Sequence, residues 1–167
     1  MATSSLELKR LPFLHELTPE QLAHFQSFLT VVHAEPGVPI IREGDLGDRL
    51  FILAEGTVEV FERMTLKISR KNFEDRERTL VRLSAEQGVF FGEMALFEDV
   101  PRTANVVAVT ECRLLTIDRA GFESFADAEP RAAYTILKAI ARTLTDRIQK
   151  MGADIKKLTT ALSIAVH

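Results

Sequence analysis

Between residues 31 and 117 the chain is a succession of short apolar runs separated by glycines, and this pattern restricts the fold more than any other feature. The apolar spacing there approaches two, as in strands whose alternate side chains face opposite ways. No long helical pattern lies between the runs, which disfavours a parallel sheet of strand–helix–strand units. We therefore expect an all-β barrel or jelly roll. The runs are 38–41, 50–53, 58–61, 80–83, 89–91, 106–109 and 114–117.

Residues 91–104, FGEMALFEDVPRTA, have a composition that suits a small anionic ligand. Gly92 permits close approach of the backbone, and residues 93–96 provide about one helical turn whose first N–H groups would face an anion. Arg102 adds a planar cation that can grip phosphate through two parallel hydrogen bonds. Glu93 would repel phosphate and is better suited to accept a hydrogen bond from a sugar hydroxyl. The combination indicates a ligand with one phosphate and one ribose.

This segment resembles the phosphate-binding cassette of the cyclic nucleotide-binding domain family. That cassette reads F-G-E-aliphatic-A-L, a short variable stretch, then P-R-[T/S/A]-A, and every fixed position is matched here, including the spacing from Glu93 to Arg102. Residues 43–60 resemble the glycine-marked early strands of the family. Residues 116–122 resemble its closing strand and the start of the helix that follows.

The resemblance implies a mainly β fold with flanking helices: a double-stranded β-helix (jelly-roll) barrel with N-terminal helices and a long C-terminal helix. We expect an N-terminal helical segment at residues 1–35, a cyclic nucleotide-binding β-barrel at 36–128, and a lid and dimerisation helix at 129–167. Thr18, Pro19 and Gln21 form a capping-box signature for a helix in the first segment. That helix is either a lid packed on the barrel edge or an element that moves when ligand binds.

The resemblance also implies which residues contact a 3′,5′-cyclic nucleotide. Arg102 would bind the cyclic phosphate and Glu93 the ribose, whereas Thr103 would touch the phosphate or assist guanine recognition, so both cAMP and cGMP stay open. The base would lie under the C-terminal helix, where Arg147 either stacks on it or flanks a coiled coil. Gly92, Met94 and Ala95 would bind the ligand mainly through their backbone N–H groups. The expected set is Phe91, Gly92, Glu93, Met94, Ala95, Arg102, Thr103, Ala104, Thr143 and Arg147.

Each of the three principal side chains also has an ordinary structural interpretation. Arg102 could form a surface salt bridge with Glu98 or Asp99. Glu93 could simply be an acid at a helix start, stabilised by the helix dipole. Thr103 could be a plain strand residue.

From residue 131 onward the pattern is helical, and apolar residues recur every seven positions. Two such series form the a and d positions of a coiled coil over more than three heptads. Because this heptad stripe is longer than one barrel can cover, we expect its distal part to pair with a second copy in a homodimer. Its members are Leu137, Ala141, Leu144, Ile148, Met151, Ile155, Leu158 and Leu162.

Residues 62–79 are long and highly charged for the hairpin that the family has at this place. They form either a solvated hairpin extension or a loop that docks a partner through Lys67, Arg70 and Lys71.

Composition disfavours several function classes. A net charge of −3 gives no basic bias for binding duplex DNA. No apolar run approaches membrane-spanning length, and there is no signal-peptide core, so we expect a cytoplasmic protein without a membrane contact. The single cysteine, Cys112, is expected to be a buried small hydrophobe. The histidines lie away from the cassette and form no metal-ligand pair, so a metal-dependent enzyme is disfavoured; they are His15, His24, His33 and His167.

Three functions remain. The first is a non-enzymatic sensor that binds cAMP or cGMP, without a prosthetic group, and signals to an unknown downstream protein by moving its helices. The second is a truncated cyclic nucleotide-responsive transcription regulator, because the chain ends about where a DNA-binding domain would begin. As it stands, the sequence implies a stand-alone domain with no direct nucleic-acid binding. The third is a dimerisation module with a degenerate pocket, which the intact Glu93 and Arg102 disfavour.

Overall fold

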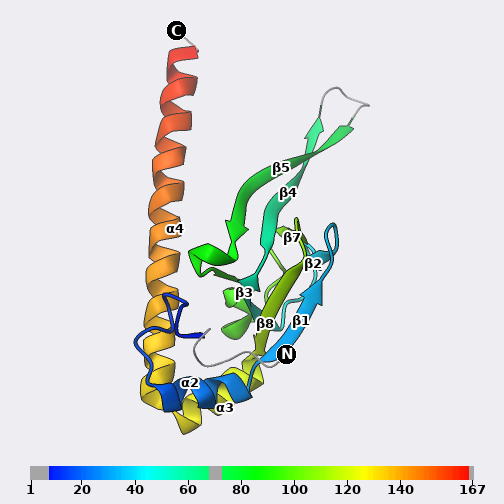
Figure 1. Cartoon of the computed structure of the whole chain (residues 1–167). Helices are drawn as coiled ribbons and strands as arrows, with labels where there is room; N and C mark the ends of the chain where they lie inside the picture. The colour runs from blue at the N-terminus through cyan, green and yellow to red at the C-terminus, as the bar shows by residue number, and fades with distance from the viewer. Residues whose placement is uncertain (1–7, 68–72, 166–167) are drawn as a thin grey trace.

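The computed structural model describes residues 8–67 and 73–165, and its β-strands form two four-stranded antiparallel sheets (Figure 1). The strand orders are β1-β8-β3-β6 and β2-β7-β4-β5. The expected jelly-roll fold is thereby confirmed. The strands are β1 (Thr30–Ala34), β2 (Pro39–Ile41), β3 (Arg49–Glu55), β4 (Thr57–Lys67), β5 (Phe73–Ser84), β6 (Phe90–Phe91), β7 (Asn105–Ala108) and β8 (Cys112–Asp118).

Strand β3 is buried on both faces, and the alternation of its side chains contributes to two cores. Phe51 and Leu53 point into the barrel, where they pack with residues of the other sheet such as Val58. Leu50 and Ile52 point the opposite way and pack with the helices. This explains why β3 reads as a continuous apolar run rather than as alternating apolar and polar residues.

Each of the seven expected apolar runs overlaps a strand, but none of these runs corresponds to β1. It lies within residues 1–35, which were expected to be helical, so the β-structure begins at Thr30 rather than at residue 36. Only Ala34 of this strand is buried. Because most of its side chains are not buried, the sequence of β1 shows no alternation of apolar and polar residues. It is a strand because its backbone pairs with β8.

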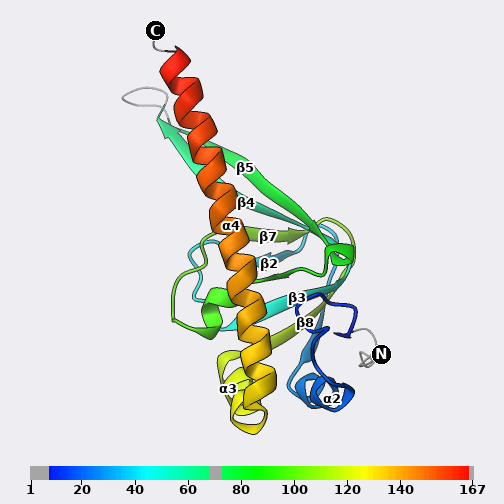
Figure 2. The ribbon, with the colours of Figure 1, turned by 90° about the vertical axis from the view of Figure 1, so that its left-hand side faces the viewer.

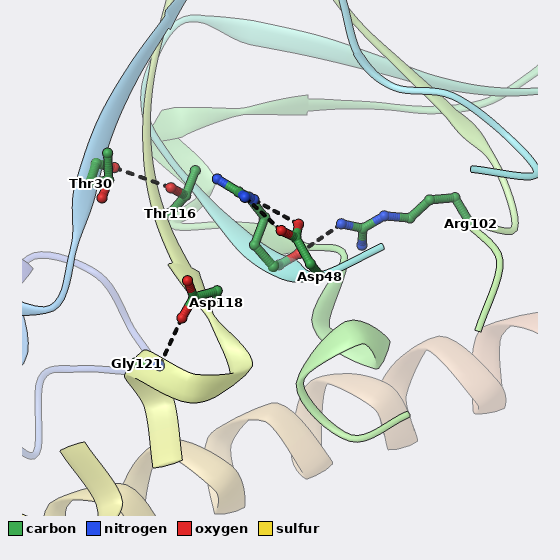
Figure 3. A network of polar contacts seen from close by, with 7 residues as sticks. Thr30, Asp48, Arg102, Thr116, Asp118 and Gly121 are labelled. Carbon is green, nitrogen blue, oxygen red and sulfur yellow. Dashed lines mark hydrogen bonds and ion pairs between the residues drawn. The ribbon is translucent and has the colours of Figure 1, made fainter. Parts of the chain in front are cut away.

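Helices cover one face of the sheet that contains β3: α2 (Pro19–Ser27), α3 (Arg119–Ala128) and α4 (Pro130–Ala165). The expected capping box of α2 is present, with Thr18 Oγ1 accepting from the Gln21 N–H at 3.3 Å. Asp118 caps α3 by accepting from the Gly121 N–H at 2.7 Å (Figure 3). Among the described residues, no helix combines the length and the apolar content needed to cross a membrane.

Helix α4 packs on the sheet with its first half and extends past it with its second half (Figures 1 and 2). Ile136 and Ile140 are fully buried against the sheet and α3. Further along, Ile148 is 68% exposed and Ile155 60% exposed. The long C-terminal helix is therefore confirmed, and its distal apolar residues have no cover within the described part of the chain.

Strands β4 and β5 form one long hairpin that projects in the same direction as the distal part of α4 (Figures 1 and 2). The hairpin expected at residues 62–79 is thus confirmed. Arg70 and Lys71 lie outside the described residues, and docking of a partner there stays a prediction.

Candidate functional site

The segment expected to form a one-turn helix is a 3₁₀ helix, η2 (Glu93–Leu96), directly after β6. Gly92 joins the two with φ at +75°, a left-handed conformation that suits glycine. Ala95 and Leu96 are buried and anchor the turn, whereas the Met94 side chain is 47% exposed. The ligand contact expected from the backbone of Met94 and Ala95 stays a prediction.

Arg102 lies in a loop that is fixed to the loop before β3. Its N–H donates to the Asp45 carbonyl at 2.8 Å, and its own carbonyl accepts from the Gly44 N–H at 2.9 Å. The guanidinium turns inward, where Nη1 donates to the Gly92 carbonyl at 3.0 Å. Its Nη2 donates to the Arg49 carbonyl at 2.9 Å (Figure 3). A guanidinium carries five N–H donors, so these two bonds fix its orientation and leave others for a ligand.

The electrostatic surroundings of Arg102 differ from those of a surface salt bridge. Asp99, one of the two acids considered as its partner, pairs with Arg119 at 2.9 Å. No carboxylate of the described residues lies within ion-pair distance of Arg102. Burial lowers the pKa of Arg102, while the carboxylates of Asp48 and Glu93 act in the opposite direction. The side chain is thus a half-buried cation without a direct counterion.

Gly47 and Gly92 have no side chains, and this provides the space in which the Arg102 guanidinium lies. A Cβ at Gly47 would lie 2.3 Å from Arg102 Cζ, and one at Gly92 would lie 2.6 Å from its Nη1. The ring of Phe51 lies below, 5.7 Å from Arg102 Cζ. The roles of Gly47 and Phe51 were missed from the sequence, although both lie in the glycine-marked block that resembles the family.

Asp48 and Arg49 form a two-bond ion pair beside the site, at 2.7 and 2.6 Å (Figure 3). The hydrogen bonds from Arg49 lower the pKa of Asp48. The pair compensates the charge of Asp48, a carboxylate that acts on Arg102, and also fixes the residue whose carbonyl holds Arg102. Nothing in the sequence marked this pair as part of the site.

Glu93 is 5% exposed, and its charge is compensated by α4. Arg147 Nη1 donates to Glu93 Oε1 at 2.8 Å, and Nη2 donates to the Phe90 carbonyl at 2.9 Å. The guanidinium also lies 5.6 Å from the centre of the Phe90 ring. Arg147 therefore contacts the cassette directly, so its interpretation as a solvated flank of a coiled coil is wrong. Stacking on a base stays a prediction.

The second oxygen of Glu93 is open to a ligand. Among the described residues, no contact to Oε2 is present, and no fully buried side-chain oxygen or nitrogen lacks a hydrogen-bond partner. Oε2 is therefore not completely buried. Arg147 orients the carboxylate through one oxygen and leaves the other as an acceptor.

Arg119, at the start of α3, forms a second link between η2 and the helices. Its Nε and Nη2 donate to the Ala95 carbonyl at 3.2 and 3.0 Å, in addition to the ion pair with Asp99. No local pattern in the chain indicates this contact, because it depends on where α3 begins relative to the cassette.

The remaining expected residues have less definite surroundings. Phe91 is buried and stacks on Phe51 with ring centres 5.4 Å apart. Thr103 is exposed and Ala104 is half-buried in the loop before β7. The Thr143 hydroxyl donates to the Ala139 carbonyl of its own helix. Ligand contacts of these residues stay predictions. No group of three or more metal-ligating side chains occurs in the described ranges.

The family profile described as "Cyclic nucleotide-binding domain" matches residues 31–129. The chain belongs to the cyclic nucleotide-binding domain family. This domain is 32% identical over 139 residues to the Cyclic AMP receptor protein of Thermus thermophilus. The match covers 83% of this chain and 60% of that protein. The domain is 38% identical over 120 residues to cGMP-dependent protein kinase, isozyme 1, of Drosophila melanogaster, covering 70% of the chain and 14% of that protein.

A solved structure supports the same assignment. The crystal structure of Thermus thermophilus Catabolite Activator Protein superposes with a TM-score of 0.72 and 29% identity, covering 89% of this domain and 63% of that chain. The domain thus spans less than two thirds of the length of each of these relatives.

We predict that Gly47→Ala displaces the Arg102 guanidinium without unfolding the domain. Gly47 is not in the left-handed region, so alanine fits its backbone, but the new Cβ would overlap Arg102 Cζ. Titration with cyclic AMP should show at least about tenfold weaker binding, since losing one hydrogen bond to a charged group costs about 1.5–3 kcal/mol. Gly152→Ala is the control, because a methyl group at that position would meet nothing within 4 Å. Equal affinities for the two variants would contradict the prediction.

Proposed function

We propose that this domain is a non-enzymatic sensor that binds a 3′,5′-cyclic nucleotide, cAMP or cGMP, in the cassette. One observation carries the proposal: Arg102 is bonded to the Gly92 carbonyl, and the next residue, Glu93, keeps one carboxylate oxygen outside its ion pair with Arg147. A cation and an acceptor held at adjacent residues match a ligand whose phosphate is joined directly to a ribose. Arg102 would bind the phosphate and Glu93 Oε2 the ribose 2′-hydroxyl.

The family assignment supports this ligand class but leaves the base open. One relative is named for cyclic AMP and another for cGMP. Thr103 lies at the surface of the loop, where its hydroxyl could contact either nucleotide. Neither a prosthetic group nor a catalytic step is part of the proposal.

Signalling would pass from the cassette to the helices through two arginines. Arg119 ties η2 to α3, and Arg147 ties Glu93 to α4. A ligand that binds Arg102 and Glu93 would change the free energy of these contacts and so bias the position of both helices. It can shift that equilibrium only by the difference between its affinities for the two positions.

Helix α4 would also pair two copies of the domain. Its distal apolar residues are between 57% and 68% exposed, and a coiled coil would bury them; they are Ile148, Met151, Ile155 and Leu158. A dimerisation module with a degenerate pocket is the less favoured alternative, because Arg102 and Glu93 are both present and held by specific bonds. In a longer regulator the same dimer would position a further domain.

We predict that Arg102→Leu weakens cyclic AMP binding at least about tenfold, because charge-assisted hydrogen bonds to the phosphate are lost. Calorimetric titration measures the affinity, and circular dichroism checks the fold. Arg82→Leu is the matched control, since Arg82 is an exposed arginine paired with Glu59 on the surface of the hairpin. Parent-like affinity in a folded Arg102→Leu variant would remove the phosphate assignment.

We predict that Glu93→Gln weakens binding of cyclic AMP more than binding of 2′-deoxy cyclic AMP. Glutamine cannot accept the ribose hydroxyl bond as a charged group, whereas the analogue has no such hydroxyl to lose. The two affinities are compared in parent and variant by the same titration. An identical loss for both ligands would show that Glu93 does not contact the 2′-hydroxyl.

We predict that Ile155→Asp combined with Leu158→Asp gives a monomer that still binds cyclic nucleotide. Each apolar side chain fully buried in the coiled coil contributes about 1.5–3 kcal/mol, and two buried charges would remove it. Light scattering after size-exclusion chromatography reports the mass, and titration reports the binding. A variant that stays dimeric would place the interface elsewhere. Loss of all binding would mean that the lid and the dimer interface cannot be separated along α4.

A further inference from the structure

A cavity of about 280 Å³ lies beside the cassette, between the segment that precedes α2, the turn before β6 and the first half of α4. That N-terminal segment runs next to α4 in both views (Figures 1 and 2). Thr143 and Arg147 of the expected ligand-binding set line this cavity, but Glu93 and Arg102 do not, so it excludes the groups assigned to the phosphate and the ribose. Its volume is just below the range for small-molecule sites, which begins at roughly 300 Å³, so it suits a ligand of one ring.

The floor of the cavity is aromatic and already fixed in place. Phe13 and Phe90 meet edge to face with their ring centres 5.0 Å apart. Both are part of the helix-side core and are 5% and 3% exposed. Val89 and Ala139 extend the apolar lining. Side chains fixed in this way lose little conformational entropy when a ligand contacts them.

The rim of the cavity is cationic. Lys138, Arg142 and Arg147 line it from successive turns of α4, and Glu16 is the only carboxylate among the lining residues. Arg142 is 4.0 Å from Glu16, at the limit of an ion pair, and Lys138 has no ion-pair partner among the described residues. His15, the other titratable lining residue, has its Nδ1 against the Pro12 carbonyl. Because Arg147 is already paired with Glu93, Lys138 and Arg142 are the two cations that face Glu16 at the rim, and this excess of one positive charge favours an anion.

We propose that this cavity is a second binding site, specific for a small aromatic carboxylate. The ring would lie on Phe13 and Phe90, and the carboxylate would accept hydrogen bonds from Lys138 and Arg142. Arg147 lines the cavity and also bonds to Glu93, so the two sites share one side chain. Binding in the cavity does not require that the cassette binds a cyclic nucleotide, and the two proposals can fail separately.

The test uses 4-fluorobenzoate as the probe, followed by ¹⁹F NMR with the full chain. Saturable binding in the low-millimolar range or tighter is expected for a ligand of this size. The neutral analogue 4-fluorobenzamide should bind at least tenfold more weakly, because it lacks the charge. Absence of saturable 4-fluorobenzoate binding, or equal binding of the amide, would overturn the proposal.

Variants then locate the site. The double variant Lys138→Gln, Arg142→Gln should lose binding at least tenfold, whereas Lys150→Gln, an exposed lysine on the same helix away from the cavity, should not change it. Glu16→Gln removes the opposing carboxylate and should tighten binding, an outcome that damage to the fold cannot produce. Affinities unchanged in both the double variant and Glu16→Gln would place the probe elsewhere. Complete displacement of the probe by cyclic AMP would make the cavity part of the cassette and overturn a second site.

Discussion

The burial of β3 on both faces is the constraint from which the site follows. Because its alternate side chains build the barrel core and the helix-side core, the strand cannot slip by one residue without exchanging the two sets. Its first residue, Arg49, supplies a carbonyl to Arg102, and Phe51 lies under the same guanidinium. Strand β6 pairs with β3 through Phe51 and Phe91 and leads directly into η2. This doubly buried strand therefore positions both charged groups of the cassette.

The charges of the site are arranged before any ligand contact. Arg102 has two carbonyl acceptors but no ion-pair partner within the described residues, and Glu93 is paired through only one of its oxygens. An unpaired carboxylate as buried as Glu93 would be strongly destabilising, so Arg147 makes its burial possible. Groups fixed in this way lose little conformational entropy when a ligand binds, which favours affinity.

The same contacts join the cassette to the helices. Arg119 and Arg147 come from α3 and α4, and each bonds to a residue of η2. Arg147 also borders the cationic cavity next to the N-terminal segment. A side chain that lies on α4, bonds to the cassette and borders the cavity is a physical means by which binding in one place can alter another, and any such coupling acts equally in both directions.

Patterns along the chain were enough to predict the β-roll, the one-turn helix of the cassette, the cap of α2 and the long C-terminal helix. These features depend on local periodicity, on capping residues and on the order of residues 91–104. The same patterns did not reveal β1, because its side chains are mostly exposed and it becomes a strand only through its backbone pairing with β8. Nor did they reveal the space at Gly47, or the bonds of Arg119 to Ala95 and of Arg147 to Glu93, which join residues 24 and 54 positions apart. Contacts of this kind are set by the packing of strands and helices against one another, because no local preference of the chain brings such distant residues together.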